Sequence, residues 1–265
     1  MSKRISGFKP TGSLQLGNYV GAIRPTLEGQ HRFETTEFVA DLHAMTVPHV
    51  PKQLNAYTYE AAALLLACGI DPETTPLYVQ SHLPAHVELH YLLECAATYG
   101  EAHRMIQFKE KGGSGSRLSL LTYPALMAAD ILVHDIDEVP VGDDQGQHLE
   151  LTRDVATRFN ALYGETFVVP KVVHPPVAAR LADLSYPTAK MGKTNASSSG
   201  VLFLLDEPGV LRRKVLRAVT DTEREVRYMP DTKPGVSNLL DILAVCTGEP
   251  PHTLAAQFSG YGQLK

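Results

Sequence analysis

The stretch Pro10-Thr-Gly-Ser-Leu-Gln-Leu-Gly-Asn18 is the first clue to the fold of this chain. It follows a short segment, Arg4 to Ser6, that we expect to be a buried strand, and it precedes an apolar run, Tyr19 to Ile23, that we expect to open a helix. A glycine-containing loop between a strand and a helix lets the backbone approach a phosphate closely. The loop matches neither common nucleotide-binding fingerprint, so taken alone it is more often an ordinary turn with a helix cap.

The composition describes a globular protein with no global attraction for nucleic acid. The chain has 265 residues, with 24 Lys and Arg against 29 Asp and Glu, so we expect no DNA partner, and any RNA would bind a local patch. The three isolated cysteines fit a reducing cytosol and argue against a disulfide scaffold or a cysteine-based zinc site. The longest apolar run, residues 61–67, is too short to span a membrane. We therefore expect a cytoplasmic protein with no membrane partner and no metal held by its side chains.

Strand-like and helix-like segments alternate through the first half of the chain. The run Phe38 to His43 is typical of a buried strand that ends in polar residues, which places Asp41 and His43 at the edge where ligands bind in open parallel sheets. His43 is equally compatible with a histidine that only finds a partner in the core. The further expected elements are a helix at Gln53–Cys68 capped by Gly69, a strand at Pro76–Gln80, and a helix at Pro84–Gly100 that continues after a break through Glu101–Lys111.

The segment Thr122 to Leu132 predicts a helix with one distinctive face. Thr122 is the expected N-cap, and Tyr123, Met127 and Asp130 are spaced so that they share a face. Such a face describes an apolar pocket with one hydrogen-bond acceptor at its floor, although core packing beside an exposed aspartate is the plain alternative. Because apolar residues flank Asp130, we expect its carboxylate to be buried with a bound donor.

The segment Glu138 to Gln145 repeats the strand–turn–helix pattern of the first stretch. A strand at Val139–Val141 ends in a turn at Gly142, and a long helix follows with a buried stripe formed by Leu151, Val155, Phe159 and Leu162. Two such turns facing each other across a parallel sheet would form a nucleotide crevice. The sequence therefore predicts an α/β fold with a Rossmann-like parallel sheet.

Lysines cluster at two polar segments. Lys109 and Lys111 end a helix beside a Gly/Ser-rich linker, and Lys190 and Lys193 lie three apart in the loop 186–200. Lysines on a loop that closes over a site are suited to stabilise charge on a leaving phosphate, although solvated surface lysines are far more common. The remainder looks helical, at Leu211–Ala218 and Val236–Cys246. We expect a catalytic domain at 1–185, a mobile loop at 186–200 and the start of a helical domain at 201–265.

Together these pieces resemble the class I aminoacyl-tRNA synthetases, and within them the bacterial tryptophanyl enzymes. The resemblance runs from about Ser6 to Lys265 with its motifs in order. Those motifs are Gln15-Leu-Gly-Asn18 in the HIGH region, Asp41 to Thr46 at a strand end, Tyr123 to Asp130 as the amino-acid helix, Gly142-Asp-Asp-Gln145 with the helix start Gln147 to Asp154, and Lys190-Met-Gly-Lys-Thr194 in place of KMSKS. The tyrosyl enzymes share both signature loops, but the run Tyr-Pro-x-x-Met-x-x-Asp favours the tryptophan branch.

The resemblance implies activation of L-tryptophan by ATP, with Mg²⁺ bound through the triphosphate, and transfer to tRNA(Trp). It implies a tryptophan site made of Asp130 as acceptor of the indole N–H together with Ile5, His43, Tyr123, Met127, Val139, Val141 and Gln145. It implies ATP contacts from Lys9, Pro10, Thr11, Gly17, Asn18, Gly142, Asp143, Asp144, Leu181, Lys190, Met191, Gly192, Lys193 and Thr194. Catalytic charge stabilisation falls to Asn18, Lys109, Lys111, Lys190 and Lys193, and a homodimer is expected.

The sequence departs from the pattern of the family at a few positions. Gly192 and Thr194 replace the two serines of KMSKS, Lys9 stands where relatives commonly have glutamine, and Ile5 stands where an aromatic wall is expected. The family also continues with further helices that reach the anticodon, so the helical part is expected to be truncated here. The alternative function is therefore a truncated or secondary paralogue that makes tryptophanyl-adenylate, or binds tryptophan, without charging tRNA efficiently.

Overall fold

The computed structural model describes residues 1–113, 115–141, 145–173, 181–192 and 198–265, apart from the side chains of Glu110 and Lys111. The chain divides into two compact units. The first unit comprises Met1–Thr11 and Pro25–Pro176, and the second comprises Gly12–Arg24 and Val177–Lys265. The loop 10–18 is thus divided between the units, because residues 12–18 belong to the second.

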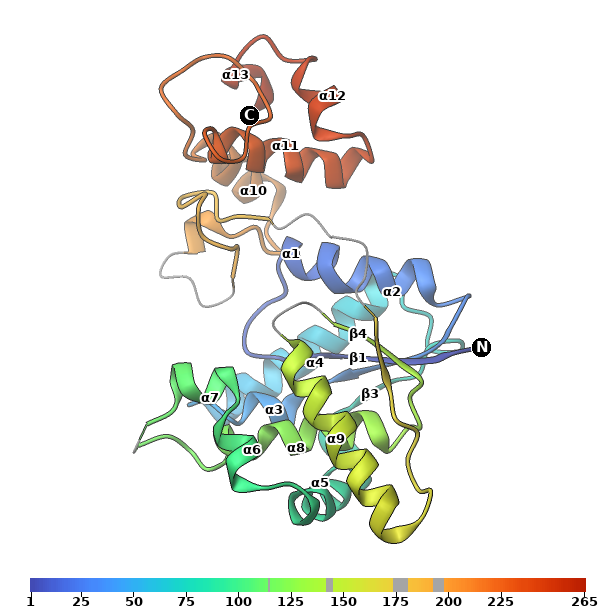
Figure 1. Ribbon diagram of the computed structural model, residues 1–265. Coiled ribbons are helices and arrows are strands. Elements are labelled where there is room, and N and C mark those ends of the chain that lie inside the picture. Colours follow the sequence, from blue (N-terminus) through green and yellow to red (C-terminus); the bar gives the residue numbers. More distant parts are fainter. Residues whose placement is uncertain (114, 142–144, 174–180, 193–197) are drawn as a thin grey trace. The chain divides into compact units, whose positions relative to one another are not determined.

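A five-stranded sheet with every pair of strands parallel forms the centre of the first unit (Figure 1). The strand order is β3-β2-β1-β4-β5. Parallel neighbours need crossover connections, which helices supply, so the predicted Rossmann-like fold is confirmed. The strands are β1 (Lys3–Phe8), β2 (Glu34–Val39), β3 (Leu77–Val79), β4 (Glu138–Pro140) and β5 (Lys171–Val173).

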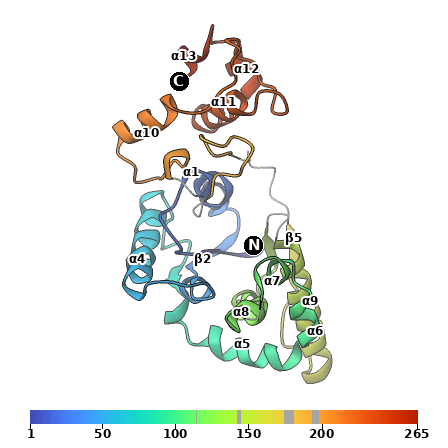
Figure 2. The same cartoon turned by 90° about the vertical axis from the view of Figure 1, so that its left-hand side faces the viewer.

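Helices cover both faces of this sheet. Figure 2 shows α4 on one side of β2 and α8 and α9 on the other. Helices α5, α8 and α9 pack together through a second apolar cluster that contains Leu93, Ala128 and Val155. The helical segments are α2 (Arg24–Gly29), α3 (Asp41–Ala44), α4 (Pro51–Ala67), the 3₁₀ turn η2 (Gln80–His82), α5 (Ala85–Ala96), α6 (Tyr99–His103), α7 (Ile106–Lys111), α8 (Ser119–Leu132) and α9 (Gly146–Tyr163).

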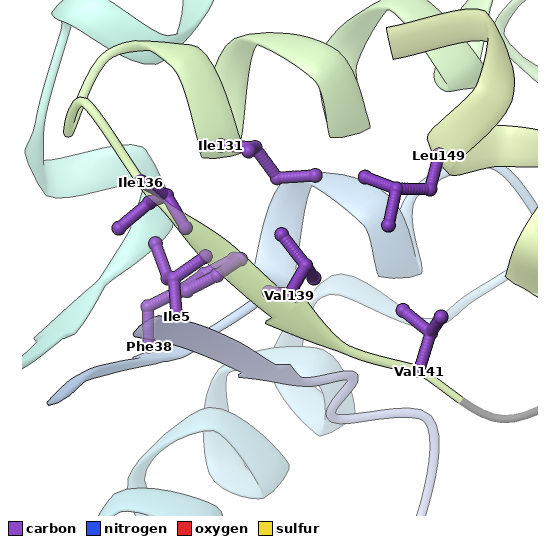
Figure 3. Packing of buried hydrophobic residues seen from close by; sticks show 8 residues of the cluster. Ile5, Phe38, Ile131, Ile136, Val139, Val141 and Leu149 are labelled. Carbon is purple, nitrogen blue, oxygen red and sulfur yellow. The ribbon is translucent and has the colours of Figure 1, made fainter. Parts of the chain in front are cut away.

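The core between the sheet and α8 and α9 is a cluster of branched and aromatic side chains (Figure 3). Alternate residues of a strand point to one face, so Ile5 of β1 and Phe38 of β2 meet Ile131 of α8 there. Gly7 lies beside Phe38 in the sheet register, and a Cβ added to Gly7 would come 2.6 Å from Cζ of the Phe38 ring. Glycine at this position therefore lets the phenylalanine ring lie flat across β1.

The expected start of α8 was wrong. The helix begins at Ser119, one turn before the predicted cap, and the backbone N–H of Thr122 donates to Leu118 within that turn. Pro124 consequently lies inside the helix rather than in its first turn. Leu118 occupies the cap position without a side-chain hydrogen bond, so no polar cap residue marks this start in the sequence.

The long helix expected from Pro84 into Lys111 is three helices. Thr98 ends the first stretch and caps α6, because its backbone N–H donates to Glu101 Oε2 (2.8 Å) and its hydroxyl accepts from the Glu101 backbone (3.3 Å). This reciprocal arrangement is a capping box, visible in the sequence as T-x-x-E. The expected stripe on α9 was also wrong at its end, because Leu162 is 67% exposed.

The second unit is helical, as expected from the sequence. The predicted helix at Tyr19–Ile23 is a π-helical turn, η1, that continues α1 (Leu16–Asn18). The other elements are the 3₁₀ turn η4 (Ser198–Gly200), α10 (Pro208–Leu216), α11 (Pro234–Thr247), α12 (Pro251–Ala255) and α13 (Tyr261–Leu264). Buried residues of α11, including Val236 and Leu240, pack with Leu254 of α12 in the core of this unit. No helix among the described residues is long and apolar enough to cross a membrane.

Glu37 of β2 is a fully buried carboxyl group on the opposite side of the strand from Phe38. Thr26 donates a hydrogen bond to its Oε1 (2.8 Å), and Oε2 has no hydrogen-bond partner in the described part of the chain. Burial raises the pKa of Glu37 to about 8, although hydrogen bonds from Thr26 and Ser6 oppose the shift. At neutral pH this group is therefore protonated in the folded chain.

We predict that Glu37 makes stability fall as the pH rises from about 4.5 to about 8. The unfolded chain releases the Glu37 proton in this window while the folded chain keeps it, which costs about 3 kcal/mol by pH 7. Glu37→Gln should remove that slope and should be more stable than the native chain at pH 9. Urea unfolding at pH 5, 7 and 9 measures this, with exposed Glu34→Gln as the matched control. Parallel stability curves for the native chain and Glu37→Gln would contradict it.

Candidate functional site

Asp130 of α8 is a buried carboxylate with donors from three other elements. Its exposed fraction is 2%, so water does not solvate it. Oδ1 lies 2.7 Å from Gln80 Nε2 and 2.7 Å from His86 Nδ1, and Oδ2 lies 2.7 Å from His43 Nε2. Burial alone raises the pKa of Asp130, but the hydrogen bonds from His43 and His86 are the largest opposing causes, and the pKa lies below its usual value. The expectation of a buried, hydrogen-bonded Asp130 is confirmed.

The donors reach Asp130 from the ends of two neighbouring strands and from α5. The expected strand through His43 was too long, because β2 ends at Val39 and residues 41–44 form α3. Gln80 opens η2 directly after β3, which pairs with β2. Asp41 fixes these two strand ends together, since its carboxylate accepts from the Ser81 backbone (3.0 Å) and hydroxyl (2.5 Å). Asp41 is therefore used to hold the loops rather than left open at the edge.

One aromatic side chain, Tyr123, and one thioether side chain, Met127, lie on the same face of α8 as Asp130. The Tyr123 ring lies edge-on to His43, with 6.1 Å between ring centroids, and its hydroxyl contacts Nε2 of the buried His148. Met127 packs against the apolar cluster that contains Ile131. The predicted shared face of Tyr123, Met127 and Asp130 is thus present on α8.

Three of the other residues expected at the tryptophan site belong to the apolar core cluster beside α8. Ile5, Val139 and Val141 all belong to the core cluster against which Met127 packs, and each is less than one tenth exposed (Figure 3). Gln145 is half-buried and immediately precedes α9. Whether these side chains contact a substrate stays a prediction, and Gly142, Asp143 and Asp144, expected at the ribose, lie outside the described residues.

Residues that follow β1 in the first unit carry the predicted phosphate-side contacts. Lys9 and Thr11 are exposed and Pro10 is buried, and the Thr11 backbone donates to the Lys9 carbonyl (3.0 Å) in a tight turn.

Lys109 is exposed on α7, and the side chain of Lys111 lies outside the described part. Among the described residues, no group of three histidines, cysteines or acidic residues is arranged to hold a metal ion.

In the second unit, the Gln15 side chain joins the segment 15–18 to the segment that contains Lys190 and Met191. Its Oε1 accepts from the Gly17 backbone, and its Nε2 donates to the carbonyl of Met191 (3.1 Å). Asn18 completes the cap by accepting from the Gln15 backbone (3.1 Å). A Cβ on Gly17 would lie 2.9 Å from Gln15 Oε1, so glycine is needed where the carboxamide folds over the turn. Gln15 is 4% exposed and acts here as an internal brace.

The base of the lysine-bearing loop is fixed by backbone contacts within the second unit. Lys190 pairs with Ala182 in an isolated bridge, and the Met191 backbone donates to the carbonyl of the buried Leu181 (3.0 Å). Met191 is buried, Gly192 is half-buried and Lys190 is exposed. Lys193 and Thr194 lie outside the described residues. The side chain of Lys190 therefore leaves a rigid anchor point with access to solvent.

A second anchor for the loop is the close approach of Gly200 to Asp183. Asp183 Oδ1 accepts from the backbones of Ser185 (2.7 Å) and Tyr186 (3.1 Å). A Cβ at Gly200 would lie 1.7 Å from the same oxygen, so only glycine is accommodated. Both ends of the loop 186–200 are consequently fixed near one buried carboxylate.

Sequence reasoning missed Gln80, His86, Tyr78 and His134. Gln80 follows a strand directly, so the rule that marked Asp41 as an edge residue would also have marked Gln80. His86 lies near the start of α5 with His82 and His90 four residues to either side, and no local pattern distinguishes it from them. Its contact with Asp130 depends on tertiary packing between α5 and α8.

Comparisons with known proteins agree with this geometry. The family model described as "tRNA synthetases class I (W and Y)" matches residues 2–262. The chain is 53% identical to "Tryptophan--tRNA ligase 1" of Streptomyces avermitilis, with 100% of the chain and 82% of that protein covered. It is 47% identical to "Tryptophan--tRNA ligase" of Caldanaerobacter subterraneus, again covering 100% of the chain and 82% of that protein.

Solved structures give the same result. The tryptophanyl-tRNA synthetase of Mycoplasma pneumoniae is similar with a TM-score of 0.88 and 38% identity, over 100% of this chain and 82% of that one. The enzyme of Campylobacter jejuni, solved with ADP and tryptophan, is similar with a TM-score of 0.83 and 30% identity over 99% of this chain and 82% of that one. The chain therefore belongs to the class I tRNA synthetase family that comprises the tryptophan and tyrosine enzymes.

Proposed function

We propose that this chain is a tryptophan–tRNA ligase. It activates L-tryptophan with ATP to tryptophanyl-adenylate, releases pyrophosphate, and transfers the tryptophanyl group to tRNA(Trp) in the cytoplasm. The names of the relatives support the substrate, and the buried Asp130 carboxylate is the single structural observation that carries it. A carboxylate oxygen has two lone pairs, and Oδ2 accepts one hydrogen bond among the described residues. It retains the capacity to accept an indole N–H.

In the first step, a carboxylate oxygen of tryptophan attacks the α-phosphorus of ATP. The bond from that phosphorus to the bridging oxygen breaks, and pyrophosphate leaves; a Mg²⁺ ion bound through the triphosphate would neutralise part of the negative charge. In the second step, a ribose hydroxyl of tRNA attacks the carbonyl carbon and AMP leaves. No enzyme nucleophile takes part, so the chain contributes positioning and charge stabilisation.

The site residues of the resemblance take these roles in the proposal. Asp130 accepts the indole N–H of the amino acid. The side chains that surround the amino acid are those of Ile5, His43, Tyr123, Met127, Val139, Val141 and Gln145. Lys109, Lys111, Lys190 and Lys193 stabilise the negative charge that develops on pyrophosphate. The nucleotide site is completed by twelve further residues that contact ATP: Lys9, Pro10, Thr11, Gly17, Asn18, Gly142, Asp143, Asp144, Leu181, Met191, Gly192 and Thr194.

We also propose that two copies of the chain associate through α5. Val87 and Leu92 are each 51% exposed there, and Tyr91 is 66% exposed. Exposed apolar residues gathered on one helix are a common mark of an interface between protein subunits. This helix also carries His86, so subunit contact and amino-acid binding would share one element.

Asp130→Asn tests the proposed acceptor. The substitution keeps the shape of the side chain and removes its charge, so kcat/KM for tryptophan in ATP–pyrophosphate exchange should fall about 10- to 100-fold, as expected for loss of a hydrogen bond to a charged group. Exposed Asp154→Asn, on α9, is the matched control. An unchanged preference for tryptophan over phenylalanine in Asp130→Asn would refute the assignment.

Lys190→Ala tests the role of the loop. If Lys190 stabilises the leaving pyrophosphate, kcat for the exchange should fall about 100-fold or more, while the Kd for tryptophan measured by calorimetry stays within twofold. Lys52→Ala, at an exposed position of α4, should change neither. Equal losses in kcat and in tryptophan binding would argue for a structural role of Lys190.

Tyr91→Glu tests the proposed interface. A charge in the centre of an apolar contact is costly, so analytical ultracentrifugation should show the native chain as a dimer and Tyr91→Glu as mainly monomer at micromolar concentration. Tyr163→Glu, at a position 71% exposed on α9, should remain dimeric. A native chain that sediments as a monomer would exclude the dimer.

A further inference from the structure

Behind Asp130, on the side away from His43, three rings continue the chain of hydrogen bonds. His86 of α5 is fully buried, and its Nε2 lies 2.9 Å from the hydroxyl of Tyr78 on β3. The same hydroxyl lies 2.8 Å from Nε2 of His134, just after α8. The three ring centroids lie 5.5–5.7 Å from one another, so the rings form a compact triangle. Neither the proposed chemistry nor the family resemblance gives this triangle a role.

The direction of each hydrogen bond in the triangle follows from Asp130. A carboxylate only accepts, so Nδ1 of His86 must carry the hydrogen that it shares with Oδ1. If His86 carries this single N–H, its Nε2 accepts, and the Tyr78 hydroxyl donates to it. The oxygen of Tyr78 is left to accept from Nε2–H of His134. All three donors therefore point toward Asp130.

Burial supports the neutral arrangement of these rings. Burial, aided by the charge of Asp130, raises the pKa of Tyr78, so its hydroxyl keeps the hydrogen that it donates. Burial lowers the pKa of half-buried His134, which favours its neutral form at pH 7.

The consequence for Asp130 is that one oxygen is saturated. Oδ1 accepts from His86 and Gln80, which uses both of its lone pairs. Oδ2 accepts from His43 alone among the described residues. Gln80 is itself held, because its Oε1 lies 3.4 Å from the His43 backbone nitrogen. These hydrogen bonds oppose rotation of the carboxylate and so orient the remaining lone pair of Oδ2.

We propose that His134, Tyr78 and His86 form a relay of positioning residues that fixes the Asp130 carboxylate so that only Oδ2 recognises the N–H of the substrate side chain. The relay rests on the proposed function, since the substrate it serves is tryptophan. None of its three residues touches substrate. They act through Asp130, so their loss should affect recognition of the side-chain donor more than the chemistry at the phosphate.

Tyr78→Phe is the decisive variant, because it removes one hydroxyl and leaves the ring that stacks on Phe38 (5.7 Å between centroids). In ATP–pyrophosphate exchange, KM for tryptophan should rise about 3- to 10-fold, with kcat and KM for ATP within twofold of the native values. The preference for tryptophan over phenylalanine, which has no side-chain donor, should shrink by the same factor. Exposed Tyr163→Phe is the matched control and should change nothing.

Two variants of His86 separate a positioning role from mere packing. Asn keeps an amide N–H near the place of Nδ1, whereas Leu fills the volume without a donor. His86→Asn should therefore retain tryptophan recognition better than His86→Leu when both are compared at equal thermal stability. Equal loss in the two variants, or a Tyr78→Phe protein that loses only thermal stability, would overturn the relay.

Nitrogen NMR of the native chain labelled with ¹⁵N-histidine tests the relay without any risk of misfolding. The signals of His86, assigned by their loss in His86→Asn, should show a protonated Nδ1 and an unprotonated Nε2. Protonation at Nε2 would refute the direction of the relay while leaving the ligase intact. A native chain without tryptophan-dependent exchange would instead refute the proposed function, which separates the two failures.

Discussion

A single buried negative charge organises the strand ends and helices around α8 in the first unit. Removing a carboxylate from water is costly unless donors replace the water, and Asp130 obtains three donors from α3, η2 and α5. Two of those elements begin where neighbouring parallel strands end, because Val39 of β2 is paired with Val79 of β3. A shift of one residue in that register would carry Gln80 away from Asp130. The register of β2 and β3 therefore places the donors of Asp130, and the need of the buried charge for those donors favours that register.

In the second unit, an uncharged side chain, that of Gln15, holds two distant segments together. The Gln15 carboxamide uses its oxygen for the Gly17 backbone and its nitrogen for the Met191 carbonyl, so one side chain joins segments 176 residues apart. Gly200 beside Asp183 closes the other end of the loop. Lys190 extends from this fixed base, which limits the positions that its ammonium group can reach. Rigid anchors at both ends are what a loop needs if its lysine is to meet a phosphate reproducibly.

The sequence predicted the parts of the site that local patterns encode. The apolar neighbours of Asp130 required its burial, and the spacing to Tyr123 placed both on one face of α8; the structure confirms both. The donor His86 could not be assigned in this way, because it reaches Asp130 through packing between helices, and Tyr78 behind it contacts His86 rather than Asp130. The errors at Thr122 and at Thr98 have a different cause. α8 starts after Leu118, which has no side-chain cap, so no cap residue marks that start, whereas the capping box of Thr98 is visible in the sequence but was not used to divide the helix.

Under the proposed function, the saturation of Oδ1 would also let one carboxylate distinguish several aromatic side chains. Phenylalanine has no donor and would bury the last lone pair of Oδ2 without a partner, which carries a desolvation cost. A tyrosine hydroxyl is a donor, but it lies at a different distance and direction from the ring than an indole N–H. A carboxylate free to rotate would follow that misplaced donor and bind it nearly as well. With His86 and Gln80 bound to Oδ1, Asp130 would not follow, so in the proposed site position as well as chemistry would determine which side chain is accepted.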